Sequence, residues 1–284
     1  AYCQLGRTIE MRAAPTPFYQ PGEILQAVGT KVAQAREIGE QIDYLSFVPD
    51  GEPTLDANLG REIELLRPLG IPIAVISNAS LVWMPEVRES LLKADWVSLK
   101  VDTTQEAVWR RLDRPQSTLR LAPIIDGMCE FAALYTGELA TETMLVEGMN
   151  DSDEQVGQVA KLLADLKPAR AYLSIPTRPP AKGWVHAPTE ETIHRAYQIL
   201  SEKAPRVEYL IGYEGNEFSR TGNPEEDLLS ITAVHPMRQD AVEQFLARAG
   251  AHWTVVRRLL ASGQIIEIEY GGRRFYMRKL RKPS

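Results

Sequence analysis

Cysteine is nearly absent from this chain of 284 residues, which contains only Cys3 and Cys129. Two cysteines cannot form a disulfide framework, and their scarcity predicts a cytoplasmic protein in a reducing compartment. The four histidines show no metal-ligand spacing such as HxxxH, which argues against a zinc site. Apolar runs of about 18 residues are also missing, so we expect no membrane partner, and the first residues of the sequence do not lead us to expect a signal peptide.

Positive charge is scarce overall but is concentrated at the end of the chain. The formal net charge is −6, yet from Asn223 onward ten Lys and Arg stand against seven Asp and Glu, which is +3 and leaves −9 for residues 1–222. This asymmetry predicts two domains, with a boundary near residue 223.

Short apolar segments alternate with helical patterns over the first 213 residues. The segments expected as strands are 44–48, 71–77, 96–101, 140–146, 170–176 and 206–213. The helical patterns cover 21–39, 56–69, 84–93, 118–134, 152–166 and 189–204. This alternation predicts a parallel sheet with helices outside. Periodicity alone leaves open whether the sheet curves into a partial barrel or stays doubly wound.

The pattern changes after residue 222. Asn223 and Pro224 mark the start of a helix, as N-cap and first helical residue. Two further helical patterns each end in glycine, and alternating runs then flank Gly271-Gly272, which is a strong hairpin signal. Three short helices and a hairpin predict a winged-helix domain over 223–284.

Two of the expected strands end in residues suited to ligand binding. "PDGEPTLD" follows the first strand and places Gly51, Glu52 and Pro53 at an exposed sheet edge, where α/β proteins bind ligands. Asn78 follows the second strand at the same edge. The alternative is that both segments are ordinary turns.

The third strand, "VSLKVDTT", carries Ser98, Lys100 and Asp102 on one face. Three polar side chains on one face of a central strand are costly unless they pair or line a site. A simple Lys100–Asp102 ion pair is the alternative interpretation.

Taken in order, these segments resemble the radical S-adenosylmethionine (SAM) superfamily. Tyr2-Cys3 resembles the last two positions of its CxxxCxΦC motif, in which Φ is aromatic, and "DGEP" resembles its GGE-type motif. "ADWVSLKVDT", "RRLDRPQSTLRLAPIIDGMCEF" and "TMLVEGMNDSDEQV" resemble segments of radical SAM activases and of wybutosine-type tRNA-modifying enzymes. The resemblance covers roughly residues 1–215 and implies a partial (β/α)6 TIM-like barrel, with the other two cysteines of the motif lying upstream of Ala1.

The resemblance also implies a chemistry. A [4Fe–4S] cluster, with Cys3 as one of its ligands, would cleave SAM reductively to methionine and a 5′-deoxyadenosyl radical. Glu52 would hold the SAM amino group, Lys100 the carboxylate, and Ser98 or Asp102 a ribose hydroxyl. Tyr2 and Pro176 would flank the adenine, and an electron donor such as flavodoxin or ferredoxin would reduce the cluster.

Two other classes of function remain open on the sequence. The positive charge of the C-terminal domain is typical of a nucleic-acid-binding regulator. Its third helix, however, is rich in Val and Leu and poor in side chains that read bases. A non-catalytic SAM-binding protein is the other alternative. The sequence does not identify the substrate: the winged helix and the wybutosine-type resemblance favour RNA or a protein, and the activase-like segments favour a glycyl-radical enzyme.

Overall fold

The computed structural model describes residues 1–3, 11–48, 51–210, 218 and 220–279. It divides into two compact units, one formed by residues 1–25 and 44–213 and the other by residues 26–43 and 214–284. The sequence placed a single boundary at residue 223, whereas the second unit also takes in most of the first helix, α1 (Pro21–Glu37). None of the described helices is long and apolar enough to cross a bilayer.

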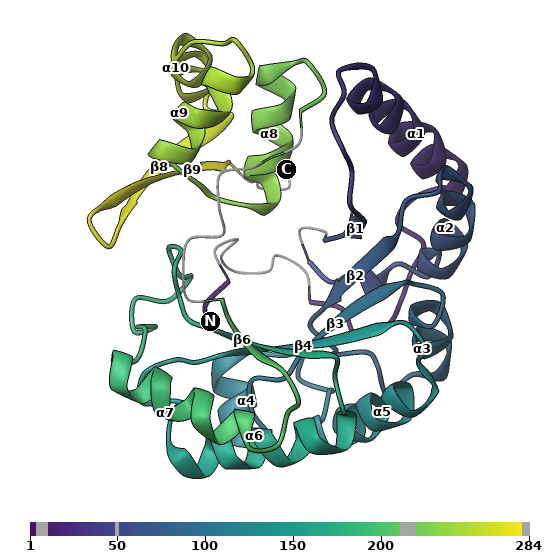
Figure 1. Cartoon of the computed structure of the whole chain (residues 1–284), viewed down its shortest axis with the longest axis vertical. Coiled ribbons are helices and arrows are strands. Elements are labelled where there is room, and N and C mark those ends of the chain that lie inside the picture. Colours follow the sequence, from purple (N-terminus) through teal and green to yellow (C-terminus); the bar gives the residue numbers. More distant parts are fainter. Residues whose placement is uncertain (4–10, 49–50, 211–217, 219, 280–284) are drawn as a thin grey trace. The chain divides into compact units, whose positions relative to one another are not determined.

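The first unit is built on six parallel strands, whose order in the sheet is their order in the sequence (Figure 1). They are β1 (Leu45–Phe47), β2 (Ile73–Ser77), β3 (Trp96–Lys100), β4 (Glu138–Met144), β5 (Arg170–Ser174) and β6 (Val207–Leu210). A sequential order excludes the doubly wound alternative, in which the strand order reverses at a switch point. The predicted partial TIM-like sheet is therefore confirmed, and only the segment 211–213 of the last expected strand lies outside the described residues.

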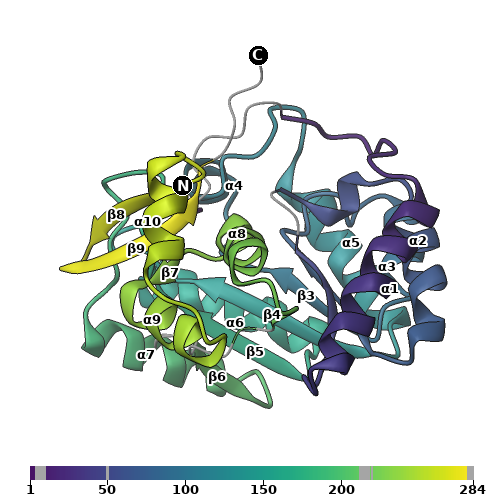
Figure 2. The same ribbon diagram turned by 90° about the horizontal axis from the view of Figure 1, so that it is seen from above.

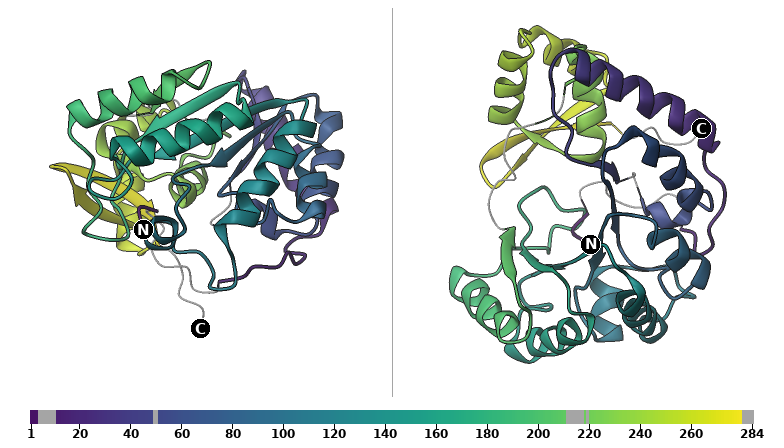
Figure 3. Two further views of the ribbon diagram at one scale, coloured as in Figure 1. Left: turned by 90° about the horizontal axis from the view of Figure 1, so that it is seen from below. Right: turned by 45° about the vertical axis from the view of Figure 1, so that its right-hand side comes forward.

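Helices cover one side of this sheet, as the view from below shows (Figure 3, left). They are α2 (Leu59–Leu66), α3 (Pro85–Leu91), α4 (Glu106–Leu112), α5 (Leu121–Leu134), α6 (Asp153–Leu166) and α7 (Glu190–Ser201), with 3-10 turns at Pro53–Leu55 and Arg67–Leu69. Helix α4 was not expected from the sequence, because its seven residues are too few for a helical period to stand out.

The core of this unit lies between the strands and these helices. Val97, Leu99 and Leu173 of the sheet are fully buried, as are Phe131 of α5 and Leu163 of α6. Side chains alternate along a strand, so this packing turns Ser98 and Lys100 of β3 to the sheet's other face. Figure 2 shows β3, β4 and β5 running side by side.

The C-terminal part of the second unit has three helices and a three-stranded antiparallel sheet. Its elements are α8 (Pro224–Val234), β7 (Met237–Arg238), α9 (Gln239–Arg248), α10 (Thr254–Ala261), β8 (Ile265–Tyr270) and β9 (Arg273–Arg278), and the sheet order is β7-β9-β8. Asn223 caps α8 through its side chain, as predicted. Gly271 and Gly272 both have positive φ, as a two-residue hairpin turn requires.

One close contact in the first unit generates a stability prediction. A Cβ added at Gly127 in α5 would lie 2.6 Å from Trp83 Cα and 2.6 Å from the Val82 carbonyl oxygen. Both are backbone atoms that cannot rotate away, so we expect Gly127→Ala to lower the free energy of unfolding by about 1–3 kcal/mol.

Gly157→Ala in α6 is the matched control, because a Cβ there meets nothing within 4 Å. It should raise stability by about 0.5–1 kcal/mol, the ordinary gain from replacing a helical glycine. Chemical denaturation of both variants measures the difference, and equal stabilities would contradict the close packing of α5.

Candidate cofactor-binding site

Polar residues gather at the carboxyl ends of the first five strands, and those singled out in the sequence lie on or after β1, β2 and β3. Parallel strands bring these ends to one edge of the sheet, which is where ligands bind in α/β folds. Two hydrogen-bonded groups form there, one after β1 and β2 and the other across β3, β4 and β5.

Glu52 is the centre of the first group. Its Oε1 accepts from the Thr54 backbone N at 3.1 Å, from Thr54 Oγ1 at 2.7 Å and from Ser77 Oγ at 2.7 Å, while its Oε2 accepts from the Asn78 backbone N at 2.6 Å. The residue is only 5 % exposed. The expectation of an exposed Glu52 was therefore wrong, because its carboxylate ties the loop after β1 to the end of β2. Burial raises the pKa of Glu52, although these hydrogen bonds oppose the shift.

The neighbours of Glu52 shape the turn. Pro53 is buried and opens a 3-10 turn capped by Glu52, which fits its expected role of stiffening the loop. Gly51 is exposed, and a Cβ there would meet nothing within 4 Å. Asn78 Oδ1 accepts from the Ser80 backbone N at 2.9 Å, so this side chain forms a turn as well as lying at the edge.

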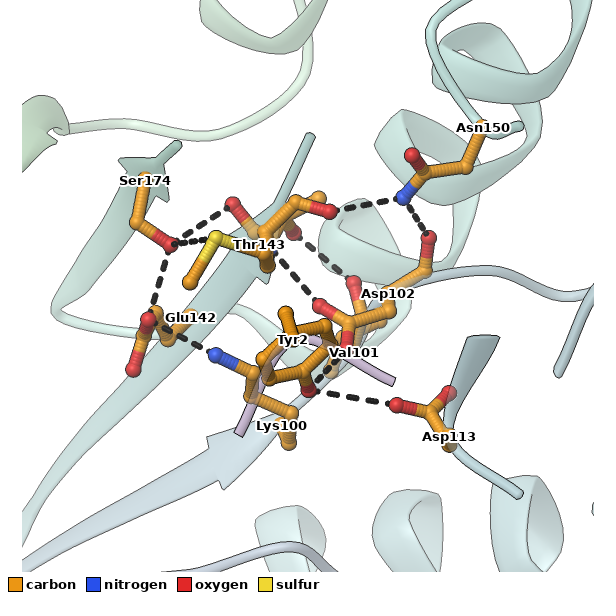
Figure 4. Close-up of polar contacts among 10 residues, drawn as sticks. Tyr2, Lys100, Val101, Asp102, Asp113, Glu142, Thr143, Asn150 and Ser174 are labelled. Carbon is orange, nitrogen blue, oxygen red and sulfur yellow. Dashed lines mark hydrogen bonds and ion pairs between the residues drawn. The ribbon is translucent and has the colours of Figure 1, made fainter. Parts of the chain in front are cut away.

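The second group centres on an ion pair between adjacent strands (Figure 4). Lys100 Nζ lies 2.7 Å from Glu142 Oε1, and Ser174 Oγ donates to the same oxygen at 2.7 Å. The alternative Lys100–Asp102 pair does not form, because the register of β3 and β4 sets Lys100 directly opposite Glu142. Burial disfavours both charges, yet each partner stabilises the other, so the pKa of Lys100 is raised and the pKa of Glu142 is lowered.

Asp102 follows β3 and bonds elsewhere. Its Oδ1 accepts from the Met144 backbone N at 2.7 Å and its Oδ2 from the Tyr2 hydroxyl at 2.6 Å. Tyr2 therefore reaches the sheet edge, where the Lys100 ammonium stands 5.0 Å from the centre of its ring. Burial and the carboxylates of Asp102 and Asp113 raise the pKa of Tyr2 well above its usual range.

The remaining predicted residues lie near this edge without forming described side-chain hydrogen bonds. Ser98 is buried on β3 opposite Ala140, and Pro176 is buried two residues beyond β5. Cys3 is exposed. Cys129, expected in the core, is partly exposed on α5 instead.

Sequence reasoning missed four polar residues that complete the edge: Asp113, Glu142, Asn150 and Ser174. Asn150 Nδ2 donates to the carbonyl oxygens of Asp102 and Met144, each at 2.8 Å, so it joins the ends of β3 and β4. A lone glutamate inside the expected strand 140–146 was a signal for Glu142. Asp113 gave none, because it follows a helix that was not expected.

The donor set fits SAM better than it fits a complete iron–sulfur cluster. An ammonium, carboxylates and hydroxyls at one sheet edge suit an amino acid and a ribose. Among the described residues no group of three or more His, Cys, Asp or Glu side chains is placed to hold a metal ion. Cys3 offers one thiolate, fewer than a cluster needs.

Sequence comparison finds relatives that carry the UPF0026 name. A UPF0026 protein of Methanocaldococcus jannaschii is 40 % identical over 282 residues, covering 99 % of this chain and 87 % of that protein. A UPF0026 protein of a Synechocystis species is 32 % identical over 179 residues, covering 63 % of this chain and 64 % of that protein. No protein-family model matches the chain.

Solved structures share the fold over about two thirds of this chain. A radical SAM methyltransferase from Sphaerobacter thermophilus aligns with a TM-score of 0.54 at 22 % identity, covering 68 % of this chain and 59 % of that one. TYW1 with a lysine–pyruvate adduct bound aligns with a TM-score of 0.52 at 14 % identity, covering 66 % and 64 %. The chain thus has the fold of radical SAM enzymes.

The bonding of Glu52 predicts that it supports the fold. Glu52→Ala leaves the donors of Thr54, Ser77 and Asn78 without their acceptor in a buried place. Each unsatisfied buried donor costs about 1–3 kcal/mol, so we expect a clear fall in melting temperature even without any ligand.

Glu52→Gln is the matched variant, since it keeps one acceptor oxygen and the side-chain shape. It should lose less stability than Glu52→Ala when both are measured by thermal unfolding. An unchanged melting temperature for Glu52→Ala would mean that the carboxylate does not join β1 to β2.

Proposed function

Since this chain belongs to the UPF0026 family and has the radical SAM fold, we propose that it is a radical SAM iron–sulfur enzyme of the oxidoreductase or transferase type. The observation that carries this proposal is the hydrogen bond from Tyr2 to Asp102, which sets the segment bearing Cys3 beside Lys100 at the sheet edge. When bound, a [4Fe–4S] cluster and SAM supply a one-electron reductive cleavage to methionine and a 5′-deoxyadenosyl radical. The electron would come from a donor such as flavodoxin or ferredoxin.

The residues at the edge would divide the binding of SAM among themselves. Lys100 has three donor protons and shares its ammonium with Glu142, which leaves donors for the SAM carboxylate. Glu52 Oε2 has one described partner, so it retains a lone pair for the SAM amino group. The exposed Gly51 would let that group approach the backbone, because it has no side chain. Ser98 or Asp102 would bind a ribose hydroxyl, Asn78 would border the same edge, and Tyr2 and Pro176 would flank the adenine.

Cys3 would supply one of three cluster thiolates in this proposal. The other two would belong to a CxxxC segment encoded immediately before Ala1, with its second cysteine adjacent to Ala1. Protein that includes the encoded upstream segment is therefore the material for the test, and an upstream sequence without those cysteines contradicts the catalytic proposal.

The proposal predicts SAM binding that depends on the Lys100 ammonium. Lys100→Met combined with Glu142→Gln removes both charges together, so that neither is left buried alone. Losing a hydrogen bond to a charged group costs about 1.5–3 kcal/mol, so we expect about 10–100-fold weaker SAM binding by calorimetry. Reductant-driven formation of 5′-deoxyadenosine should fall with it.

Glu142→Gln alone is the second variant: it removes the carboxylate that competes for Lys100 and leaves the buried ammonium without its partner, so the free protein should be less stable, and a SAM carboxylate would then supply the missing charge. It should bind SAM at least as tightly as the unmodified protein. Equal affinity of the double variant would remove Lys100 from the SAM site. SAM binding without cleavage, in protein with a loaded cluster, would favour the non-catalytic SAM-binding alternative.

We further propose that the C-terminal part of the second unit is a winged helix that docks RNA. Its three helices and the sheet order β7-β9-β8 support this interpretation. Arg257 of α10, Arg273 and Arg278 of β9 and Lys279 are exposed and lack an ion-pair partner within the described chain. Arg281 and Lys282 lie outside the described residues.

Salt-dependent binding tests the RNA proposal. Arg257→Ala with Arg273→Ala should weaken binding of a labelled single-stranded RNA and lower the salt slope by about 1.4, or 0.7 for each lost phosphate contact. Lys161→Ala with Lys203→Ala removes the same charge from exposed sites of the first unit and is the control. Equal effects of the two double variants would contradict a dedicated RNA surface, and tight binding to one duplex DNA sequence would favour a DNA-binding regulator.

A further inference from the structure

The Tyr2 hydroxyl stands between two carboxyl groups, and this raises a problem of proton count (Figure 4). It lies 2.6 Å from Asp102 Oδ2 and 3.1 Å from Asp113 Oδ1. A phenol has one proton to donate, so it can donate along only one of these contacts. If both carboxyls were ionised, the second contact would set two oxygen lone pairs against each other.

Asp102 is the member of the pair that accepts on both oxygens. Its Oδ1 takes the Met144 backbone N–H at 2.7 Å, and its Oδ2 is the nearer acceptor for Tyr2. Asp113 receives no comparable backbone donor among the described hydrogen bonds. Burial, the neighbouring Asp102 charge and a side-chain hydrogen bond with Asp102 raise the pKa of Asp113 well above its usual range, although the Lys100 ammonium opposes the shift. A proton on Asp113 therefore lies within reach of both Asp102 and the Tyr2 hydroxyl.

We propose that Asp113 carries a proton and donates it to the Tyr2 hydroxyl, which in turn donates to Asp102. This chain of two hydrogen bonds, from Asp113 through Tyr2 to Asp102, anchors the segment that bears Cys3. It connects that segment to the loop after α4 and to the end of β3. Asp113 is then a positioning residue. That it positions a cluster ligand, Cys3, rests on the proposed function, whereas its anchoring of the segment 1–3 does not.

The groups around Asp113 agree with a neutral acid there. The charged side chains that face it are Asp102 and Lys100, and the Ala1 nitrogen that also faces it would be an uncharged amide in protein that includes the upstream segment. A cavity of about 20 Å³ beside it is large enough for one water molecule. The wall of this cavity on α5 and α6 is apolar, formed by Leu121, Ile124, Ile125, Met128 and Leu162. An apolar wall disfavours the charged form of a carboxyl group.

Other contacts hold residues 1–3 in place, and the part left to Asp113 is to orient the Tyr2 hydroxyl. The Ala1 amino group donates to the Leu112 carbonyl oxygen at the end of α4. Tyr2 packs against a buried cluster that includes Leu112, Val146 and Val185. These contacts hold the segment against the barrel but do not orient the Tyr2 hydroxyl, which only the two carboxyl groups contact through described hydrogen bonds.

Thermal unfolding across pH tests the proton on Asp113. In Asp113→Asn the amide donates to Tyr2 at every pH, whereas the proton of Asp113 stabilises the unmodified protein fully only below the unfolded-state pKa of about 3.9. That stabilisation is lost as pH rises through the raised pKa of the folded state. The melting temperature of Asp113→Asn minus that of the unmodified protein should therefore increase by about 2–4 °C from pH 5 to pH 9. A difference that stays constant over this range would overturn the proposal.

Spin labelling of Cys3 tests the anchoring. The label is placed on the chain of residues 1–284, in which Cys3 is exposed and Cys129→Ala leaves it as the single thiol. Asp113→Asn should leave the label as restricted as in the parent protein, whereas Asp113→Ala and Tyr2→Phe should both give a more mobile electron paramagnetic resonance spectrum. An unchanged spectrum in Asp113→Ala would overturn the anchoring role. Neither measurement uses SAM or a cluster, so failure of the proposed enzyme activity would leave this result standing.

Discussion

The ion pair between Lys100 and Glu142 is the interaction on which the arrangement of this edge depends. Both side chains are largely buried on adjacent strands, at 16 % and 24 % side-chain exposure. Removing one partner of such a pair leaves an uncompensated charge, at a cost of about 3–5 kcal/mol. The pair therefore fixes an ammonium at the carboxyl edge, and this ammonium in turn stands over the Tyr2 ring.

Each charged group at the edge already has a partner within the protein. Glu52 is held by four donors, Asp102 by two and Glu142 by Lys100 and Ser174. A site organised in this way loses little conformational entropy when a ligand arrives, because its side chains are held beforehand. A ligand at this edge would bind to the hydrogen-bond donors and acceptors that are still free, such as the remaining N–H groups of the Lys100 ammonium and the second lone pair of Glu52 Oε2.

The sequence was sufficient to predict the six strands, because each is a short apolar run between helical patterns. It also placed Glu52, Asn78 and Lys100 at strand ends, since that follows from chain order alone. It could not pair Lys100 with Glu142, because the partner across a sheet depends on the register of two strands some 40 residues apart. Asp113 was missed for a related reason, because its contact partner Tyr2 lies 111 residues away in the sequence. Asp113 also follows a helix of only seven residues, which the sequence did not predict.

The division of the chain has a consequence that composition could not reveal. Residues 26–43 belong to the second unit, and Arg220 joins that unit's two segments through Glu40 at 2.6 Å. Val32 and Ala35 of α1 are buried. A chain cut at Asn223 would therefore keep α1 but lose most of the unit to which it belongs, including the Arg220–Glu40 pair's surroundings at the start of that second segment. Low stability or aggregation of such a fragment would therefore be explained by its incomplete second unit. It would not show that the C-terminal residues take part in the chemistry.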